Sequence, residues 1–160
     1  MSDPLATYLH DHLAGARFAV SLLNDLARQD FDHDVKSLAQ HLVEEIEADR
    51  LVLEDVAERI GADTSTIKEV AAWVAQKAGR FKLSVDETIG RFEAIETLCL
   101  GVLGKLALWS AVEIVREQDF RLKQLDLEKL QARARRQHHE LESLRPVSAV
   151  AMVPEILCRV

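Results

Sequence analysis

The chain has 160 residues, 48% of them hydrophobic, with six glycines, three prolines and a net charge of −7 at neutral pH. This length suits one domain whose core needs no disulfide or metal, and the composition excludes a disordered protein and favours a helix-rich one. The acidic balance argues against nucleic acid as the main partner. The two cysteines form no disulfide framework and the N-terminus has no signal-peptide pattern, so we expect a cytoplasmic protein.

Two long amphipathic helices open the chain, because apolar residues recur at spacings of three and four. The first begins at Asp3-Pro4, an N-cap acid followed by proline, and ends near Arg28. The second ends at Ile60, with Gly61 in the position that commonly terminates a helix. The link between them is very short, which predicts an antiparallel hairpin.

A shorter apolar helix is predicted over residues 63–78, and a capping box at Ser84–Glu87 opens the third long helix. The segment from Gly61 to Asp86 is long enough to cross the full length of a bundle. We favour such a crossover, because a dedicated helix is an odd way to make a tight turn.

The third long helix, residues 86–117, is apolar on nearly every side, which predicts that other elements surround it as the central helix of the fold. Gly101 and Gly104 would let neighbouring backbones approach closely. The apolar run from Leu98 to Val112 contains Lys105 and is shorter than the ~20 residues that cross a bilayer. We therefore expect no membrane partner.

The last long helix starts at Asp119 or Asp126 and ends at Pro146. Residues 1–145 then form a single helical bundle domain. Residues 146–160 form an apolar tail that we expect to pack on the bundle or on a second subunit.

Charge is unevenly distributed between the second and the last long helix. Residues 30–60 hold ten acids and three bases, whereas residues 121–145 hold four acids and seven bases. This asymmetry predicts that the two helices attract each other across the bundle.

A few polar residues interrupt the apolar stripes of the first two helices. At ~100° per residue, Asp49 falls in the stripe of the second helix, with Glu45 on its flank. His12 flanks the stripe of the first helix, whereas His10 points away from it. The hairpin places His12 level with both acids, and because buried acids need partners we expect a His–carboxylate hydrogen bond.

The order and direction of the helices determine which other side chains lie level with Glu45 and Asp49. In a simple up-down-up-down bundle, Glu96 and His139 would approach the acids, and a metal-ligand cluster becomes possible. In the crossover version Lys105 arrives there instead, with Gln137 of the last helix close by. A lysine ammonium replaces a cation but cannot ligate one.

Familiar enzyme signatures are absent from the sequence. It contains no Glu-x-x-His motif, no phosphate-binding glycine loop and no nucleophile elbow. The basic run Arg133–Arg136 lacks interleaved aromatic residues, so we interpret it as a solvated helix surface.

Three stretches carry a family resemblance: Tyr8–Gly15, Glu45–Arg50 and Gly101–Lys105. With two helical hairpins joined by a long crossover, the chain resembles an uncharacterised bacterial branch of the ferritin-like superfamily. The resemblance implies an all-α four-helix bundle with an extra short helix in the crossover between the second and third long helices. Members that bind iron oxidise it or use it to activate oxygen, but the missing Glu-x-x-His motifs prevent a transfer of their ligands.

Two functional hypotheses follow. The favoured one is a metal-free binding or assembly module without enzymatic activity, a homodimer, whose polar centre fixes helix register or receives a small polar ligand. That centre comprises His12, Glu45, Asp49, Lys105 and Gln137. The alternative is a divergent di-metal carboxylate protein that binds iron or manganese and has oxidase-like activity. Its ligands would be His12, Glu45, Asp49, Glu96 and His139.

Overall fold

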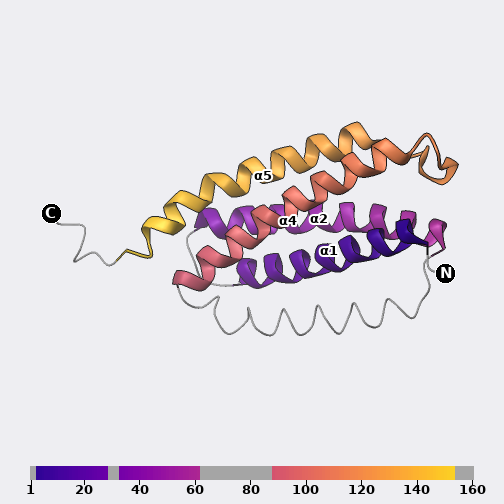
Figure 1. The fold of residues 1–160 in the computed structure, drawn as a ribbon. Coiled ribbons are helices and arrows are strands. Elements are labelled where there is room, and N and C mark those ends of the chain that lie inside the picture. The colour runs from indigo at the N-terminus through magenta and orange to yellow at the C-terminus, as the bar shows by residue number, and fades with distance from the viewer. Residues whose placement is uncertain (1–2, 29–32, 62–87, 154–160) are drawn as a thin grey trace.

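In a computed structural model of the chain, the structure describes residues 3–28, 33–61 and 88–153. Four long helices and one short 3-10 helix make up this part of the protein (Figure 1). They are α1 (Pro4–Arg28), α2 (His33–Ile60), α4 (Thr88–Val115), η1 (Phe120–Leu122) and α5 (Leu127–Val150).

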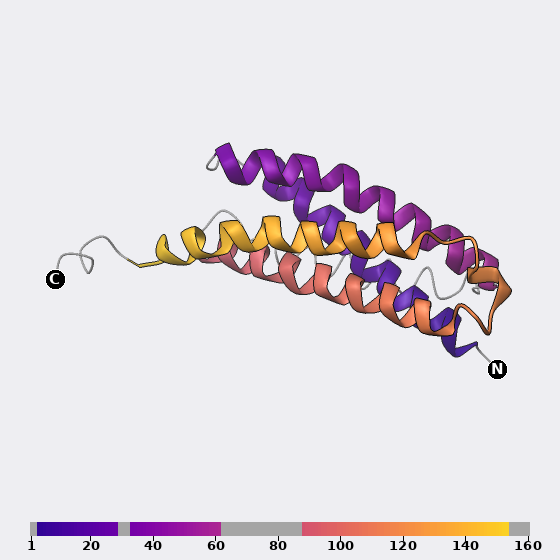
Figure 2. The ribbon, with the colours of Figure 1, turned by 90° about the horizontal axis from the view of Figure 1, so that it is seen from above.

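The long helices pack as a bundle of two hairpins. Helix α1 packs extensively on α2, and α4 on α5, while α1 also meets α4 and α2 also meets α5. Helices α2 and α4 run in one direction and α1 and α5 in the other (Figures 1 and 2). The predicted all-α bundle of four long helices is confirmed, whereas the predicted short helix and crossover fall within residues 62–87, outside the described residues.

Local signals in the sequence placed several helix ends correctly. The carboxylate of Asp3 accepts a hydrogen bond from the backbone N–H of Leu5 at 2.9 Å. Gly61 follows α2 with φ 89°, a conformation that glycine adopts without steric cost. Of the two predicted starts of the last helix, Asp126 caps α5, whereas Asp119 caps the short helix η1 that precedes it.

The predicted end of the last helix at Pro146 is wrong. Helix α5 continues through Pro146 to Val150. A proline removes only one N–H donor and has a helix-compatible φ, so this exposed position near the helix end tolerates it. Val147 and Val150 are exposed, whereas Ser148 between them is buried. Residues 154–160 lie outside the described part of the chain, so the packing of the apolar tail on the bundle or on a second subunit stays a prediction.

The core consists of two apolar clusters at different levels of the bundle. All four helices contribute to each, and they include Leu9, Leu53, Trp109 and Leu127 in one and Leu23, Leu42, Ile95 and Leu141 in the other. On α2 the first cluster begins at Leu53 and the second ends at Ile46, and Asp49 lies between them. On α4, Lys105 occupies the corresponding gap between Val102 and Leu108.

The prediction that other elements surround the apolar helix is also wrong. Leu100 is 64% exposed, and Leu103 and Ile114 are exposed too. Helix α4 packs on α5 and, over a narrower area, on α1, which leaves its remaining face uncovered among the described residues. By length and composition alone α4 could cross a membrane, with 33% of its most apolar window buried.

Candidate functional site

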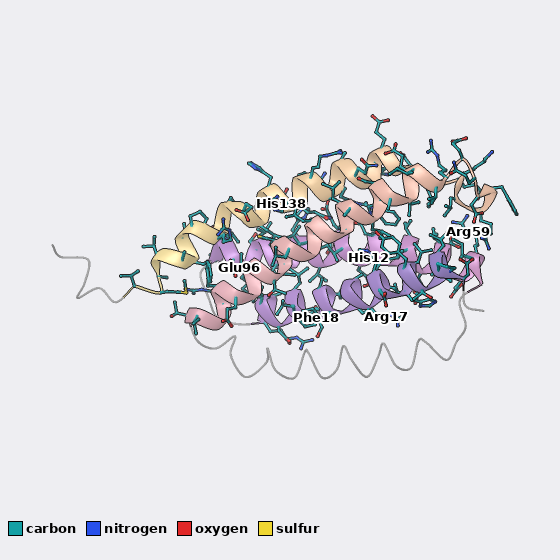
Figure 3. The ribbon with its side chains drawn as sticks, viewed as in Figure 1. His12, Arg17, Phe18, Arg59, Glu96 and His138 are labelled. Atoms are coloured by element: carbon teal, nitrogen blue, oxygen red, sulfur yellow. The ribbon has the colours of Figure 1, made fainter. Side chains whose placement is uncertain are left out.

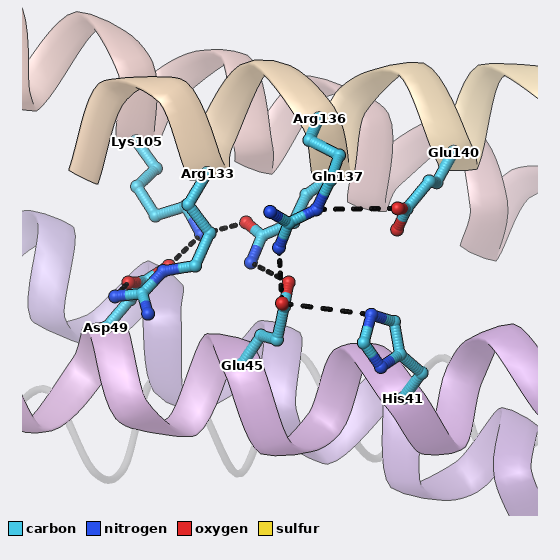
Figure 4. A network of polar contacts seen from close by, with 8 residues as sticks. All are labelled: His41, Glu45, Asp49, Lys105, Arg133, Arg136, Gln137 and Glu140. Atoms are coloured by element: carbon cyan, nitrogen blue, oxygen red, sulfur yellow. Dashed lines mark hydrogen bonds and ion pairs between the residues drawn. The ribbon is translucent and has the colours of Figure 1, made fainter. Parts of the chain in front are cut away.

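A buried carboxylate forms the centre of a polar layer between the two apolar clusters. Asp49 of α2 is 2% exposed. Its Oδ2 accepts a hydrogen bond from Nζ of Lys105 at 2.6 Å, and its Oδ1 accepts one from the guanidinium of Arg133 on α5 (Figure 4). One acid therefore joins α2 to both helices of the other hairpin.

Lys105 extends this contact to a second buried group. Its side chain is 13% exposed, and its ammonium also donates to the side-chain oxygen of Gln137, which is fully buried on α5. Burial lowers the pKa of Lys105, and the neighbouring Asp49 carboxylate opposes this shift without cancelling it.

Glu45, one turn before Asp49, continues the layer toward α5. It accepts hydrogen bonds from Nε2 of Gln137 at 2.9 Å and from the guanidinium of Arg136, and Nε2 of His41 lies 3.8 Å from its carboxylate (Figure 4). Burial raises the pKa of Glu45, but the hydrogen bonds from Gln137 and Arg136 outweigh burial and place it below its ordinary value.

The structure joins four of the five residues predicted for the polar centre, Glu45, Asp49, Lys105 and Gln137, into one hydrogen-bonded layer. His12 does not join it. Its ring packs edge-on against Tyr8 with ring centroids 4.7 Å apart, and burial lowers its pKa despite the nearby Asp11.

The expected hydrogen bond between His12 and Glu45 or Asp49 is wrong among the described residues. The reason is geometric, because Glu45 is bonded to α5 and both Asp49 oxygens are taken by cations from α4 and α5. His10, which we expected to point away from the core, is buried. Helix α1 packs against both α2 and α4, so its buried side is wider than a single stripe.

Sequence reasoning assigned Arg133 and Arg136 to a solvated surface and missed their ion pairs with α2. The Arg136 side chain is half exposed, as that assignment expects, whereas the Arg133 side chain is largely buried. Their spacing carried a usable signal. Asp49 and Glu45 are one turn apart on α2, and Arg133 and Arg136 are nearly one turn apart on the antiparallel α5. The opposite net charges of these two helices predicted the attraction, and the ion pairs show which residues provide it.

The alternative set of metal ligands is not brought together. Glu96 and His139 are both exposed. Glu96 of α4 and His12 of α1 are also well separated along the length of the bundle (Figure 3). Within the described residues, no group of three or more His, Cys, Asp or Glu side chains is placed to hold a metal ion.

A groove of about 530 Å³ runs between α1 and α4 beside the polar layer. Its wall is largely apolar, with Phe18, Leu22 and Leu98 among its members. Three glycines also line the groove: Gly15, Gly101 and Gly104. A Cβ atom added at any of the three would have no neighbouring atom within 4 Å.

Polar groups reach the groove from three helices. His12 lines the groove from α1, Lys105 lines it from α4, and Asp49 lines it from α2. Trp109 of α4 also lines it, and its buried Nε1–H has no hydrogen-bond acceptor in the described part of the chain. The groove is therefore an apolar volume with a small number of polar groups, which is the usual character of a small-molecule site.

The described residues offer little for covalent chemistry. Cys99 is buried, and burial raises the pKa of its thiol to about 12, so it is not an activated nucleophile. No protein-family model, curated protein or solved structure matches this chain. The polar layer and the groove are therefore the features of the described residues that bear on function.

Proposed function

We propose that this protein is a binding module that holds a small molecule with a largely apolar body in the groove between α1 and α4. The observation that supports this function is the groove itself, whose volume of about 530 Å³ is within the range of ligand pockets. Apolar side chains would remove the ligand body from water, which is the main favourable contribution to such binding.

The glycines of the groove support a binding role over a packing defect. Gly15, Gly101 and Gly104 lie inside long helices, where glycine costs about 0.5–1 kcal/mol relative to alanine. Among the described glycines only Gly61 has a positive φ. Neither backbone conformation nor a close neighbour therefore explains the three groove glycines, whereas space for a ligand does.

The polar layer would provide the rigid wall of this site. Asp49 and Lys105 line the groove on one side and are bonded to Arg133 and Gln137 on the other. A network with several partners fixes helix register, because each helix must place its polar group at the same level. Ligand binding and register would thus depend on the same residues.

The finer fold assignment is also a proposal. Two hairpins in which α2 and α4 run in the same direction support a ferritin-like arrangement, because a connection between two helices that point the same way must traverse the length of the bundle. This arrangement concerns architecture only and does not imply metal chemistry.

A fluorescence titration with N-phenylnaphthylamine, a neutral apolar probe, tests the binding function on the full chain. Gly104→Phe should fill the groove and weaken probe binding by about tenfold or more, because the added ring occupies the volume of the ligand. Ala107→Phe is the matched control, since Ala107 is exposed on the same helix one turn further on and does not line the groove.

Sedimentation and circular dichroism should accompany both variants, so that folding and assembly are compared directly. Equal probe affinity in the two variants would contradict binding in this groove. A dimer of the unmodified chain that Gly104→Phe dissociates, with no probe binding, would show that a second copy occupies the groove and would also overturn the proposal.

A further inference from the structure

We infer that the ligand of this groove is uncharged and extended, with a hydroxyl head group at His12 and a hydrocarbon chain that runs between α1 and α4 toward Phe18 and Leu98. The inference rests on the proposed function and specifies the chemical class of the ligand. Three features of the groove support it: the charge balance of its wall, its length, and the placement of its polar groups.

The polar layer behind the groove leaves no net charge for a ligand to compensate. Asp49 and Lys105 line the groove and belong to this layer. Its ion pairs join three acids to three bases: Glu45, Asp49 and Glu140 to Lys105, Arg133 and Arg136. Since the charges balance, neither an anionic nor a cationic head group is required at this wall.

The other charged residues of the groove wall do not favour a charged ligand either. Arg50 bonds to Glu47 and Glu54, and Glu54 also pairs with Arg17 of α1 at 2.7 Å, so this second cluster balances as well. Asp11 is exposed, and an ion pair with an exposed carboxylate contributes little. A charged head group would therefore leave water without gaining a partner, which is costly.

The groove is long and follows the two helices. On α1 its wall extends from Asp11 to Leu22, and on α4 it extends from Thr97 to Trp109. At 1.5 Å per residue these spans correspond to about 17 and about 18 Å. A volume of about 530 Å³ that is spread over such a length suits a chain better than a compact ring system.

The two ends of the groove differ in polarity. Helices α1 and α4 run in opposite directions, so the beginning of the wall on α1 lies level with the end of the wall on α4 (Figure 1). Asp11 and His12 border that end. Phe18 and Leu98 border the opposite end, where Thr97 is uncharged, and Figure 3 shows His12 and Phe18 at separate levels of α1.

His12 provides the hydrogen-bonding groups that suit a hydroxyl. Its ring is partly buried and packs edge-on against Tyr8, and the described residues form no hydrogen bond to its nitrogens. Burial lowers the pKa of His12, so the imidazole is neutral at pH 7 and has one donor and one acceptor nitrogen. A hydroxyl group also donates and accepts, which matches this ring.

Calorimetric titration of the full chain with 1-decanol, decanoate and decylamine tests the absence of charge, because the three share one alkyl chain. Decanol should bind about tenfold or more tightly than either charged analogue, since a charge that is withdrawn from water needs a partner. 1-Octanol should bind about fifteenfold more weakly than decanol, because each buried methylene contributes about fourfold. 2-Decahydronaphthol, a compact alcohol with the same number of carbons as decanol, should also bind about tenfold more weakly than decanol, because its fused rings do not extend along the groove.

Variants of His12 then locate the head group. His12→Phe keeps a ring beside Tyr8 but removes both nitrogens, so decanol should bind about two- to tenfold more weakly, while N-phenylnaphthylamine affinity stays within about twofold. His12→Gln keeps a donor and an acceptor and should retain decanol affinity. His139→Phe is the control, because His139 is exposed on α5 and does not line the groove. If His12→Phe does not fold, the head-group comparison on the unmodified chain and decanol binding by His12→Gln still decide the question.

The two proposals fail in different ways. Decanoate or decylamine binding as tight as decanol binding would overturn the uncharged head group, and equally tight binding of 2-decahydronaphthol would overturn the extended shape, while the apolar groove stands. Equal decanol affinity in His12→Phe and His139→Phe would show that the head group does not lie at His12. N-Phenylnaphthylamine binding that Gly104→Phe leaves intact would instead contradict the groove as the site.

Discussion

The two seams between the hairpins are built in opposite ways. Along the seam of α2 and α5, Glu45 and Asp49 face arginines and a glutamine, and the charged side chains fill the gap between the helices. Along the seam of α1 and α4, glycines replace large side chains and leave a groove. Lys105 belongs to both, because it lines the groove and reaches Asp49 on the far helix.

This difference separates a structural role from a binding role within one layer of the bundle. The ion pairs and hydrogen bonds that join Asp49 to Lys105 and Arg133 fix the relative positions of α2, α4 and α5. Once those helices are fixed, α1 and α4 need not pack closely at the same level. The contacts between α2 and α5, the filled seam, therefore hold the helices in place, and the groove between α1 and α4, the open seam, costs the fold less stability than it otherwise would. Substitutions of Glu45 alter the filled seam alone, and substitutions of the groove glycines alter the open seam alone.

Removing Asp49 should have the largest effect on the filled seam. We expect Asp49→Ala to lower the free energy of unfolding by about 3–5 kcal/mol, because it leaves Lys105 and Arg133 as buried, unpaired cations. Lys105→Met should cost less, about 1–3 kcal/mol, since Asp49 keeps Arg133 and loses one charged hydrogen bond. Urea denaturation of both variants measures the difference.

A double-mutant cycle between Lys105→Met and Arg133→Met provides the control for this interpretation. Either cation alone should partly satisfy Asp49, so the double variant should lose more than the sum of the single variants. Equal losses in Asp49→Ala and Lys105→Met would show that Arg133 does not support the carboxylate.

Glu45 should make the filled seam sensitive to acid, with an effect of about 1 kcal/mol at neutral pH. Its pKa in the folded protein lies below the ordinary value near 4.5, so its contribution to stability is present above that value and is lost as pH falls through the folded pKa. Glu45→Gln should therefore be less stable than the unmodified chain at pH 7, and the two should converge in acid.

The measurement is urea denaturation of both proteins from pH 7 downward, with Glu44→Gln as control because Glu44 is the exposed neighbour on α2. Other carboxylates titrate in the same interval, so only the difference between variants is informative. A stability difference that stays constant with pH would contradict the role given to the Glu45 carboxylate.

Sequence reasoning recovered most of the filled seam, because the relevant signals were local. Asp49 interrupts an apolar stripe, Gln137 lies inside another, and a single lysine interrupts an apolar helix, so helix projection and the choice of topology brought them together. The ion pairs of Arg133 and Arg136 were not predicted, because a projection of each helix alone does not show which surface arginines face a partner helix.

The open seam could not be predicted in the same way. Gly101 and Gly104 indicated close packing of a neighbouring backbone, and the structure shows the reverse, since nothing approaches within 4 Å of a Cβ at either position. A glycine in a helix is compatible with close contact or with empty space, and only the positions of the neighbouring helices distinguish the two. The prediction that other elements surround α4 failed for the same reason. A helix that is apolar on every side does not reveal which of its sides other helices cover.

The smallest predicted effect concerns these glycines and is a gain in stability. Gly104→Ala and Gly15→Ala should each raise the free energy of unfolding by about 0.5–1 kcal/mol, because alanine loses less conformational entropy in a helix and its methyl group meets no neighbour. Gly61→Ala should have the opposite sign, since φ at Gly61 is 89° and alanine adopts that conformation at a cost. Thermal unfolding of the three variants separates the cases, with a shift of about 2–4 °C expected for each kcal/mol. Destabilisation by Gly104→Ala would mean that another part of the protein packs closely against the open seam, and the contrast between the two seams would then be lost.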